Sequence, residues 1–325
     1  MVKLELEVPE SFYKEEVRND YLVSSDMKKV WAVELDLTYK LLNVCKRHNL
    51  TISACGGTLL GAVRHKGYIP WDDDIDFIMP RNDYEKLCKI ADSEFEHPYF
   101  FQTEYNDAGT LRGHAQLRNS ETTGILKMAN EIKLSFNQGI FIDIFPYDNI
   151  PDDEKLFKKM LFKTKIYKKL YMLVGNCSTR FKAYSNNSPL KMAIHYMLFP
   201  IMSLLNYNAL LERFIYKLNQ NLVSSYNKYK TKLSSSLSFN PEEKRFYYRS
   251  DLFSSIKQMK FEFINIPATE FYDDYLKNAY GDYNVFVKGG SLHGGVFFDT
   301  ENSYKKYVTD KRVSTKNDFL CSRQK

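Results

Sequence analysis

The sequence has few cysteines and lacks the groupings in which cysteine usually works. Its five cysteines are odd in number and widely spaced, and no Cys-x-x-Cys or Cys/His cluster occurs. This spacing excludes a zinc site of the finger type and a disulfide framework. Chains of this kind are typical of a reducing compartment, so we predict a cytoplasmic location.

A secretory signal and a clear membrane span are also lacking. The first 16 residues, MVKLELEVPESFYKEE, are too acidic and too interrupted for a signal peptide. Residues 192–211 form twenty positions without Asp, Glu, Lys or Arg, but Pro200, Asn206 and Asn208 interrupt them. Because a spanning helix needs about 20 predominantly apolar residues, we predict buried helices here. Contact with the inner face of a membrane is the alternative, and a true span is the least favoured.

No basic arm stands out. The net charge of +6 comes from scattered lysines, and no basic patch with interleaved aromatic residues predicts nucleic-acid binding. The lysines that follow Pro151 are expected to solvate the outer face of a packed helix. Contact with an anionic membrane surface or a polyanionic glycan is the alternative interpretation.

Apolar and aromatic residues, by contrast, are plentiful. Hydrophobic residues make up 44% of the 325 positions, with 24 Tyr and 23 Phe, so the chain can bury a substantial core. Helix-like and strand-like patterns alternate, which predicts an α/β fold. We divide the chain into a lead-in, a catalytic core, a helical section, a C-terminal strand and helix part of the core, and a loosely held tail. Their bounds are residues 1–25, 26–150, 151–232, 246–283 and 284–325.

The elements expected in the core follow from apolar periodicity and capping signals. Asp26 could cap the first helix, and Gly281 should end the last one. The expected helices cover residues 26–48, 58–65, 82–91 and 268–279. The expected strands cover residues 51–55, 75–79, 100–102, 115–118 and 139–146.

Four carboxylates lie within the five residues Asp72-Asp73-Asp74-Ile75-Asp76. Strand-forming residues follow directly, so Asp74 and Asp76 are expected to share one strand face, about 7 Å apart. Two carboxylates at this separation repel each other unless a cation lies between them. Oxygen-only ligands suit Mg²⁺ or Mn²⁺ rather than zinc, so the pattern predicts a hard-cation site.

A glycine pair precedes this acidic run. Gly56 and Gly57, followed by Thr58, lie at an expected strand-to-helix turn, where backbone N–H groups can approach a phosphate closely. Cationic donors end the short helix: Arg64, His65 and Lys66. A phosphate cradle followed by a D-x-D strand is the layout needed to bind a nucleoside diphosphate compound, with the metal neutralising its phosphates.

Two later segments carry further candidates. In the strand at 139–146, the isoleucines take one face and Asp143 takes the other, between two phenylalanines. A carboxylate there is costly to bury without a partner; a metal ion, which would make Asp143 a ligand or base, and a pair with an arginine are the two alternatives. Cationic residues between 112 and 118 could reach a phosphate or a carboxylated substrate, with a structural role as the alternative: Arg112, His114 and Arg118.

The run from Gly56 to Leu87, GGTLLGAVRHKGYIPWDDDIDFIMPRNDYEKL, closely resembles the signature of the LicD family. That family includes bacterial phosphocholine transferases and, more distantly, the fukutin-related proteins. It has the nucleotidyltransferase fold, a small mixed β-sheet flanked by helices, to which this chain would add its helical section. The resemblance is strong over residues 30–150, where GIFIDIFP around Asp143 also fits the family, and weaker over residues 246–283.

The resemblance implies a metal-dependent phosphotransferase. Asp74, Asp76 and Asp143 would hold Mg²⁺ or Mn²⁺, and Asp143 would also orient or deprotonate the attacking hydroxyl. The donor would be a CDP-activated alcohol, with CDP-choline the first candidate. The acceptor would be a sugar hydroxyl of a cell-surface glycan, such as lipopolysaccharide, teichoic acid or capsule, carried in some cases on a lipid. Two alternatives stay open: a nucleotidyltransferase that leaves the nucleotide on its acceptor, and a non-catalytic binding protein of the same fold.

Overall fold

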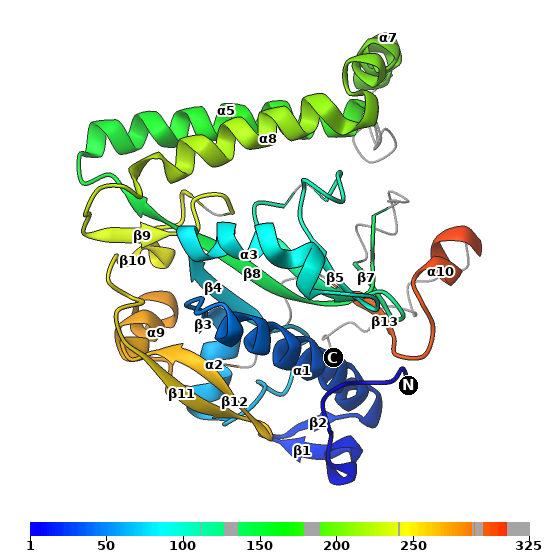
Figure 1. Ribbon diagram of the computed structural model, residues 1–325, viewed down its shortest axis with the longest axis vertical. Coiled ribbons are helices and arrows are strands. Elements are labelled where there is room, and N and C mark those ends of the chain that lie inside the picture. The colour runs from blue at the N-terminus through cyan, green and yellow to red at the C-terminus, as the bar shows by residue number, and fades with distance from the viewer. Residues whose placement is uncertain are drawn as a thin grey trace.

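A seven-stranded sheet runs through the middle of the protein (Figure 1). The structure, a computed structural model, describes residues 1–110, 112–126, 136–178, 189–239, 241–287, 289 and 295–310. Helices flank the sheet, and strands of both directions build it, so the predicted α/β fold with a mixed sheet is confirmed. The described part of the chain also has three two-stranded pairings outside this sheet.

The strands of the sheet follow the path β10–β9–β8–β4–β3, and β6 and β5 extend it from β8. Their bounds are β3 Ser53–Ala54, β4 Asp76–Pro80, β5 Tyr99–Gln102, β6 Ala115–Asn119, β8 Ile140–Ile150, β9 Leu233–Ser235 and β10 Tyr248–Arg249. The pair β4 and β8 is parallel, and the other pairs are antiparallel. The long strand β8 is therefore the central member, with β4 along one edge and β6 and β9 along the other.

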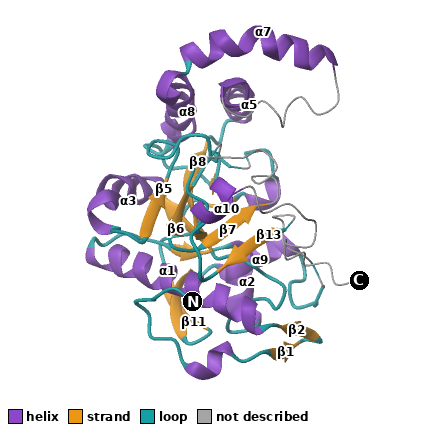
Figure 2. Cartoon of the chain, turned by 90° about the vertical axis from the view of Figure 1, so that its right-hand side faces the viewer, coloured by secondary structure: helices purple, strands orange, loops and turns teal. Residues whose placement is uncertain are grey.

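One face of the sheet is covered by α1 (Ser25–Arg47) and α3 (Arg81–Glu94), which lie on the same side of the strands in Figure 2. The first helix begins as its sequence predicts, but its cap is Ser24 rather than Asp26. The Ser24 hydroxyl accepts the N–H of Met27 at 3.2 Å, which satisfies one of the unpaired donors at the helix start.

Strand β8 shows the alternation that its sequence predicts. Ile140, Ile142 and Ile144 are fully buried in the main hydrophobic core together with the side chains of α1. Asp143 and its aromatic neighbours take the opposite face, because successive side chains of a strand point to opposite sides. The covered face thus holds the core, and the other face is left for polar groups.

A second group of elements packs around β3 and β4. Helix α2 (Gly56–Arg64) contacts β4, β11 (Ile256–Phe261) and α9 (Tyr272–Tyr280), and β12 (Ile264–Thr269) lies against β3. The helix expected at 268–279 begins later than predicted, because β12 continues to Thr269 in its hairpin with β11. It ends at Gly281 as expected, where φ is +69°.

A helical arm projects from one end of the molecule (Figure 1). It consists of α5 (Glu154–Ser178), α7 (Pro189–Leu205) and α8 (Leu210–Val223); α5 packs along α8, and α7 contacts α5. The sequence predicts buried helices in this region. The prediction of burial is wrong for α7, since Met197 and Leu204 are 68% and 77% exposed. Among the described residues, no helix has the length and apolar content needed to cross a membrane.

Segments near both ends of the chain have hydrogen-bonded partners. Val2 N–H donates to Thr300 O at 2.8 Å, and β13 (Val296–Asp299) pairs with β7 (Thr123–Leu126). The remaining elements are η1 Glu10–Tyr13, β1 Glu16–Arg18, β2 Tyr21–Val23, η2 Tyr207–Ala209, η3 Ser224–Tyr226, η4 Lys244–Phe246 and α10 Lys305–Asp310.

The sequence predicts little order for the lead-in and the tail, so these pairings differ from that expectation. Residues 311–325 of the tail, and residues 179–188 of the loop expected after α5, lie outside the described residues. The division of the chain into five parts stays a prediction.

Candidate functional site

Three carboxylates meet where β4 and β8 run side by side. Oxygen atoms of Asp74, Asp76 and Asp143 lie within 4.8 Å of one another. The parallel register of the two strands places Asp76 directly opposite Asp143, and the Asp143 N–H donates to Ile75 O at 2.9 Å. The sheet therefore brings together residues from two distant segments of the sequence.

Asp74 reaches this cluster in a way that differs from the prediction. The strand begins only at Asp76, so Asp74 lies in the preceding loop rather than on the same strand face. Asp72 and Asp73 form a second close group with Asp74. Burial, and then the nearby charges of Asp74, Asp73 and Asp76, raise the pKa of Asp72 well above its usual value. The site thus crowds carboxyl groups into a small volume, and a proton on Asp72 would relieve part of their repulsion.

The glycine pair lies at the first turn of α2 and lets that turn approach the carboxylates. Gly56 has φ of +53°, and a Cβ placed there would lie 3.1 Å from Asp76 Oδ2. A Cβ on Gly57 would lie only 2.6 Å from Asp72 Oδ2. Thr58 is the third residue of this turn, and its hydroxyl accepts the N–H of Asp76 at 2.8 Å. The turn therefore positions the start of β4, and its positive dipole end lies beside the acidic cluster.

The three cationic candidates lie at the other end of α2. Lys66 is exposed, and its ammonium donates to Val63 O at 3.0 Å. Burial, followed by Arg64, lowers the pKa of His65 to about 4, so His65 is neutral at physiological pH. The Arg64 guanidinium donates to Tyr283 O at 2.9 Å and lies over the Phe286 ring.

Of the three cationic candidates, Arg64 is connected electrostatically to the carboxylates through Tyr280. Burial lowers its pKa, and the nearby Tyr280 opposes that shift. The pKa of Tyr280 is raised by burial and then by Asp76 and Asp72. Tyr280 is therefore close to both Arg64 and the carboxylates. The roles of Arg64, His65 and Lys66 in substrate binding stay predictions.

Asp143 is held by two side chains of the neighbouring segment. The Gln116 amide donates to Asp143 Oδ1 at 2.6 Å, and His114 Nε2 lies 3.1 Å from the same oxygen. Gln116 stands opposite Asp143 in the antiparallel pairing of β6 and β8. The sequence draws attention to His114 but not to Gln116, because a glutamine in a strand carries no local signal.

Arg118 is buried beside the segment that holds Asp143. It is 1% exposed, donates to Gln102 Oε1 and Gly139 O at 2.6 Å each, and also donates to Gln116 Oε1. Its guanidinium also lies over the Phe141 ring. Arg118 therefore reaches Asp143 through Gln116, which fits the structural alternative; its substrate-binding role stays a prediction.

Residues far along the chain complete the surroundings of the site. The Gly56 N–H donates to the Tyr275 hydroxyl at 3.3 Å, and the Tyr275 ring stacks on Tyr248 with centroids 3.9 Å apart. Cys55 is buried, and burial together with the charges of the three carboxylates raises its pKa well above the usual value. Cys55 is thus a protonated thiol rather than a nucleophile. The sequence predicts none of these three roles.

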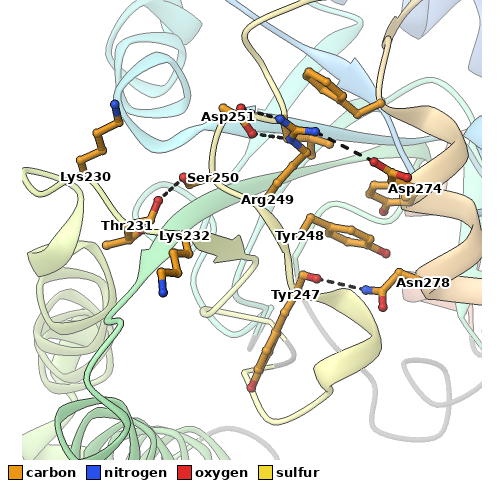
Figure 3. Close-up of a pocket in the computed structure, with 13 residues that line it drawn as sticks. Lys230, Thr231, Lys232, Tyr247, Tyr248, Arg249, Ser250, Asp251, Asp274 and Asn278 are labelled. Carbon is orange, nitrogen blue, oxygen red and sulfur yellow. Dashed lines mark hydrogen bonds and ion pairs between the residues drawn. The ribbon is translucent and has the colours of Figure 1, made fainter.

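Tyr275 and Tyr248 also line a pocket of about 580 Å³ (Figure 3). Arg249 in this pocket pairs with Asp251 at 2.5 Å and lies 4.0 Å from Asp274. Lys230 and Lys232 also line this pocket, so its lining carries three cationic groups against two carboxylates and could accept an anionic group. Phosphate binding beside the glycine turn of α2 stays a prediction.

The three carboxylates suit a hard cation. Oxygens on one Mg²⁺ are about 3 to 4 Å apart, given Mg–O distances of about 2.1 Å. Carboxylate oxygens already within 4.8 Å of one another need only small movements to reach that arrangement. Asp74, Asp76 and Asp143 could therefore hold Mg²⁺ or Mn²⁺, and a thiol does not compete, since Cys55 stays protonated.

Comparisons with known proteins converge on one group. Residues 49–172 match the family described as LicD/FKTN/FKRP, nucleotidyltransferase domain. The chain is also similar to the lipopolysaccharide cholinephosphotransferase LicD of Haemophilus influenzae. The two are 27% identical over 246 residues, which cover 74% of this chain and 84% of that protein. The matched family region contains the glycine pair, the acidic run and Asp143.

Proposed function

We propose that this chain, which is a phosphotransferase, moves phosphocholine from CDP-choline to a glycan hydroxyl. The basis for the proposal is that residues 49–172 form a nucleotidyltransferase domain of the LicD family. The observation that carries the proposal is the group of Asp74, Asp76 and Asp143 beside the glycine turn of α2. The name of the Haemophilus influenzae relative supports lipopolysaccharide as the class of acceptor.

A bound Mg²⁺ would neutralise the donor diphosphate and stabilise the leaving CMP. The residues of the chain would bind and orient the reactants around that ion. The three carboxylates would hold it, and the backbone of Gly56 and Gly57 would lie against the phosphates, where the helix dipole favours negative charge.

The transfer itself needs one proton acceptor. The sugar oxygen would attack the phosphorus that carries choline, and the bond from that phosphorus to the CMP oxygen would break, with the electron pair leaving on CMP. Asp143 would take the hydroxyl proton. Gln116 and His114 both contact Asp143 Oδ1, so they would fix the direction of this carboxylate.

A cytoplasmic location is part of the proposal. Among the described residues, Cys45, Cys55 and Cys88 are free thiols, which fits a reducing compartment. Donors such as CDP-choline would be available there, and a lipid-linked glycan would be presented at the inner face of the membrane.

The test uses CDP-choline labelled separately in its choline and its cytidine. With Mg²⁺ and a lipopolysaccharide acceptor, we expect choline label on the glycan and cytidine label in released CMP. Cytidine label on the glycan would instead identify a nucleotidyltransferase. Binding of CDP-choline without any turnover would identify a binding protein.

A matched pair of variants makes the assay specific. Asp76→Asn removes one carboxylate charge at nearly constant shape, and we expect CMP release to fall about a hundredfold or more. Asp26→Asn makes the same change on the exposed first turn of α1 and should leave the rate unchanged. A folded Asp76→Asn protein with more than a tenth of the normal rate would contradict the assignment.

A further inference from the structure

Helix α7 exposes a continuous apolar face. Leu190, Met197, Ile201 and Leu204 are 70%, 68%, 55% and 77% exposed. They are three, four or seven positions apart, so they lie along one side of the helix. Exposed apolar patches of this extent usually mark an interaction surface.

Helix α5 carries a second exposed apolar stripe. Phe162, Ile166, Leu170 and Leu173 are 66%, 40%, 43% and 38% exposed, again at helical spacing. The opposite side of α5 is the packed one, where Tyr171 and Val174 form a small core with residues of α8. The exposed stripe is therefore not needed to hold α5 on α8.

Lysines accompany the apolar stripe of α5. Residues 155–178 contain seven lysines and no acidic residue. Six of these lysines are exposed: Lys155, Lys158, Lys159, Lys163, Lys165 and Lys169. An apolar helix face bordered by lysines is the pattern of a helix that lies in the interface of an anionic membrane.

We propose that the helical arm docks on an anionic lipid bilayer, with the exposed faces of α5 and α7 in the headgroup region. The charge of the arm selects this occupant over a second copy of the chain, because two such faces would bring like-charged lysines together. Figure 1 places α7 at one extreme of the longest axis, so a bilayer can reach it without touching the sheet.

The docked arm also has a short connection to the carboxylates. A cavity of about 730 Å³ is lined by Lys169 and Leu173 of α5 and by Phe239. The Phe239 ring packs against His114 with centroids 5.1 Å apart, and His114 contacts Asp143. Only two side chains therefore separate this cavity from the cluster. The inference that a lipid-linked acceptor enters from this side rests on the proposed function. The docking of the arm on a bilayer does not depend on that function.

The experiment measures cosedimentation of the full chain with vesicles. We expect the protein to bind vesicles that contain phosphatidylglycerol, and to bind pure phosphatidylcholine vesicles much more weakly. The variant Met197→Glu/Ile201→Glu/Leu204→Glu should lose at least tenfold in binding, because carboxylates would enter the interface. The variant Lys155→Gln/Lys159→Gln/Lys163→Gln should lose roughly a hundredfold on anionic vesicles, and the loss should shrink at high salt.

Val17→Glu is the matched control. Val17 is an exposed apolar residue, 69% exposed, in the β1–β2 hairpin at the opposite end of the molecule (Figure 1). The Val17→Glu variant should bind vesicles as the wild type does. Circular dichroism and CMP release with a water-soluble acceptor should be unchanged in all of these variants, so a failed reaction and a failed docking surface give different results.

Three outcomes would overturn the proposal. One is wild-type protein that does not sediment with anionic vesicles. Another is a glutamate variant that binds as tightly as the wild type. The third is that the wild type is a dimer in sedimentation velocity, that the glutamate variant is a monomer, and that both bind vesicles equally well. This result would assign the face to a second copy of the chain.

Discussion

Asp143 Oδ1 receives an amide N–H from Gln116, and Gln116 Oε1 in turn accepts a guanidinium N–H from Arg118. This chain of contacts fixes which way the glutamine amide faces, because a guanidinium can only donate. The amide nitrogen is then turned toward the carboxylate and donates to it. The buried Arg118 is thus connected to Asp143 through Gln116.

His65 gives a prediction at the residue scale. Its pKa is lowered to about 4 in the folded protein, first by burial and then by Arg64, against about 6.5 in an unfolded chain. Between these two values the unfolded state binds more protons, so the free energy of unfolding should rise with pH from about 4 to 6.5. His65→Gln should make this rise smaller, as measured by urea unfolding across that range.

The control is the same substitution at His97, whose side chain is 66% exposed. We expect His97→Gln to leave the slope of stability against pH close to that of the wild type. If His65→Gln also leaves the slope unchanged, His65 is not buried as the structure has it.

At the scale of elements, helix α2 connects the fold to the site, and two of its glycines separate these roles. A Cβ on Gly57 would meet the far end of the Asp72 side chain, which can move, whereas a Cβ on Gly61 would lie 2.4 Å from the backbone carbonyl oxygen of Gly67. Gly57→Ala should therefore keep its melting temperature and lose tenfold or more in CMP release, since small displacements at a site are costly.

Gly61→Ala should behave in the opposite sense. Backbone atoms must shift to accept its methyl group, which costs about 1 to 3 kcal/mol of stability. This exceeds the gain of at most about 1 kcal/mol from replacing glycine in a helix. Melting temperature and CMP release, measured on both variants, check the distinction. Unchanged turnover in Gly57→Ala would remove the start of α2 from the site.

At the scale of the whole molecule, the carboxylate cluster should couple metal binding to stability. The crowded carboxylates repel one another in the metal-free protein. Mg²⁺ binds the folded state and hardly the unfolded chain, so a hundredfold excess over its Kd should add about 2.7 kcal/mol of stability. We expect a rise in melting temperature of about 5 °C, measured by differential scanning fluorimetry with increasing Mg²⁺.

The variant Asp74→Asn/Asp76→Asn tests whether these side chains serve the metal or the fold. Its melting temperature should not respond to Mg²⁺ and should be no lower than that of the metal-free wild type. A variant that melts well below the metal-free wild type would show that these aspartates form structural interactions.

The sequence by itself determined the local features of this protein. Periodicity predicted α1 and the alternation along β8, since a helix or strand repeats its buried positions at a fixed interval. The glycine pair, the acidic run and the strand around Asp143 could be recognised as a LicD-like signature, because each lies within a few consecutive residues.

Only the tertiary structure decided which of these features meet. The parallel register of β4 and β8 puts Asp143 beside Asp76, and the folding of α9 onto α2 brings Tyr275 to Gly56. No local pattern specifies such partners, because pairing depends on the packing of segments far apart in the chain. The same holds for α7: its apolar composition would fit a buried helix equally well, and it is exposed because it packs with one side, around Met202, against α5 and α8 at the end of the molecule.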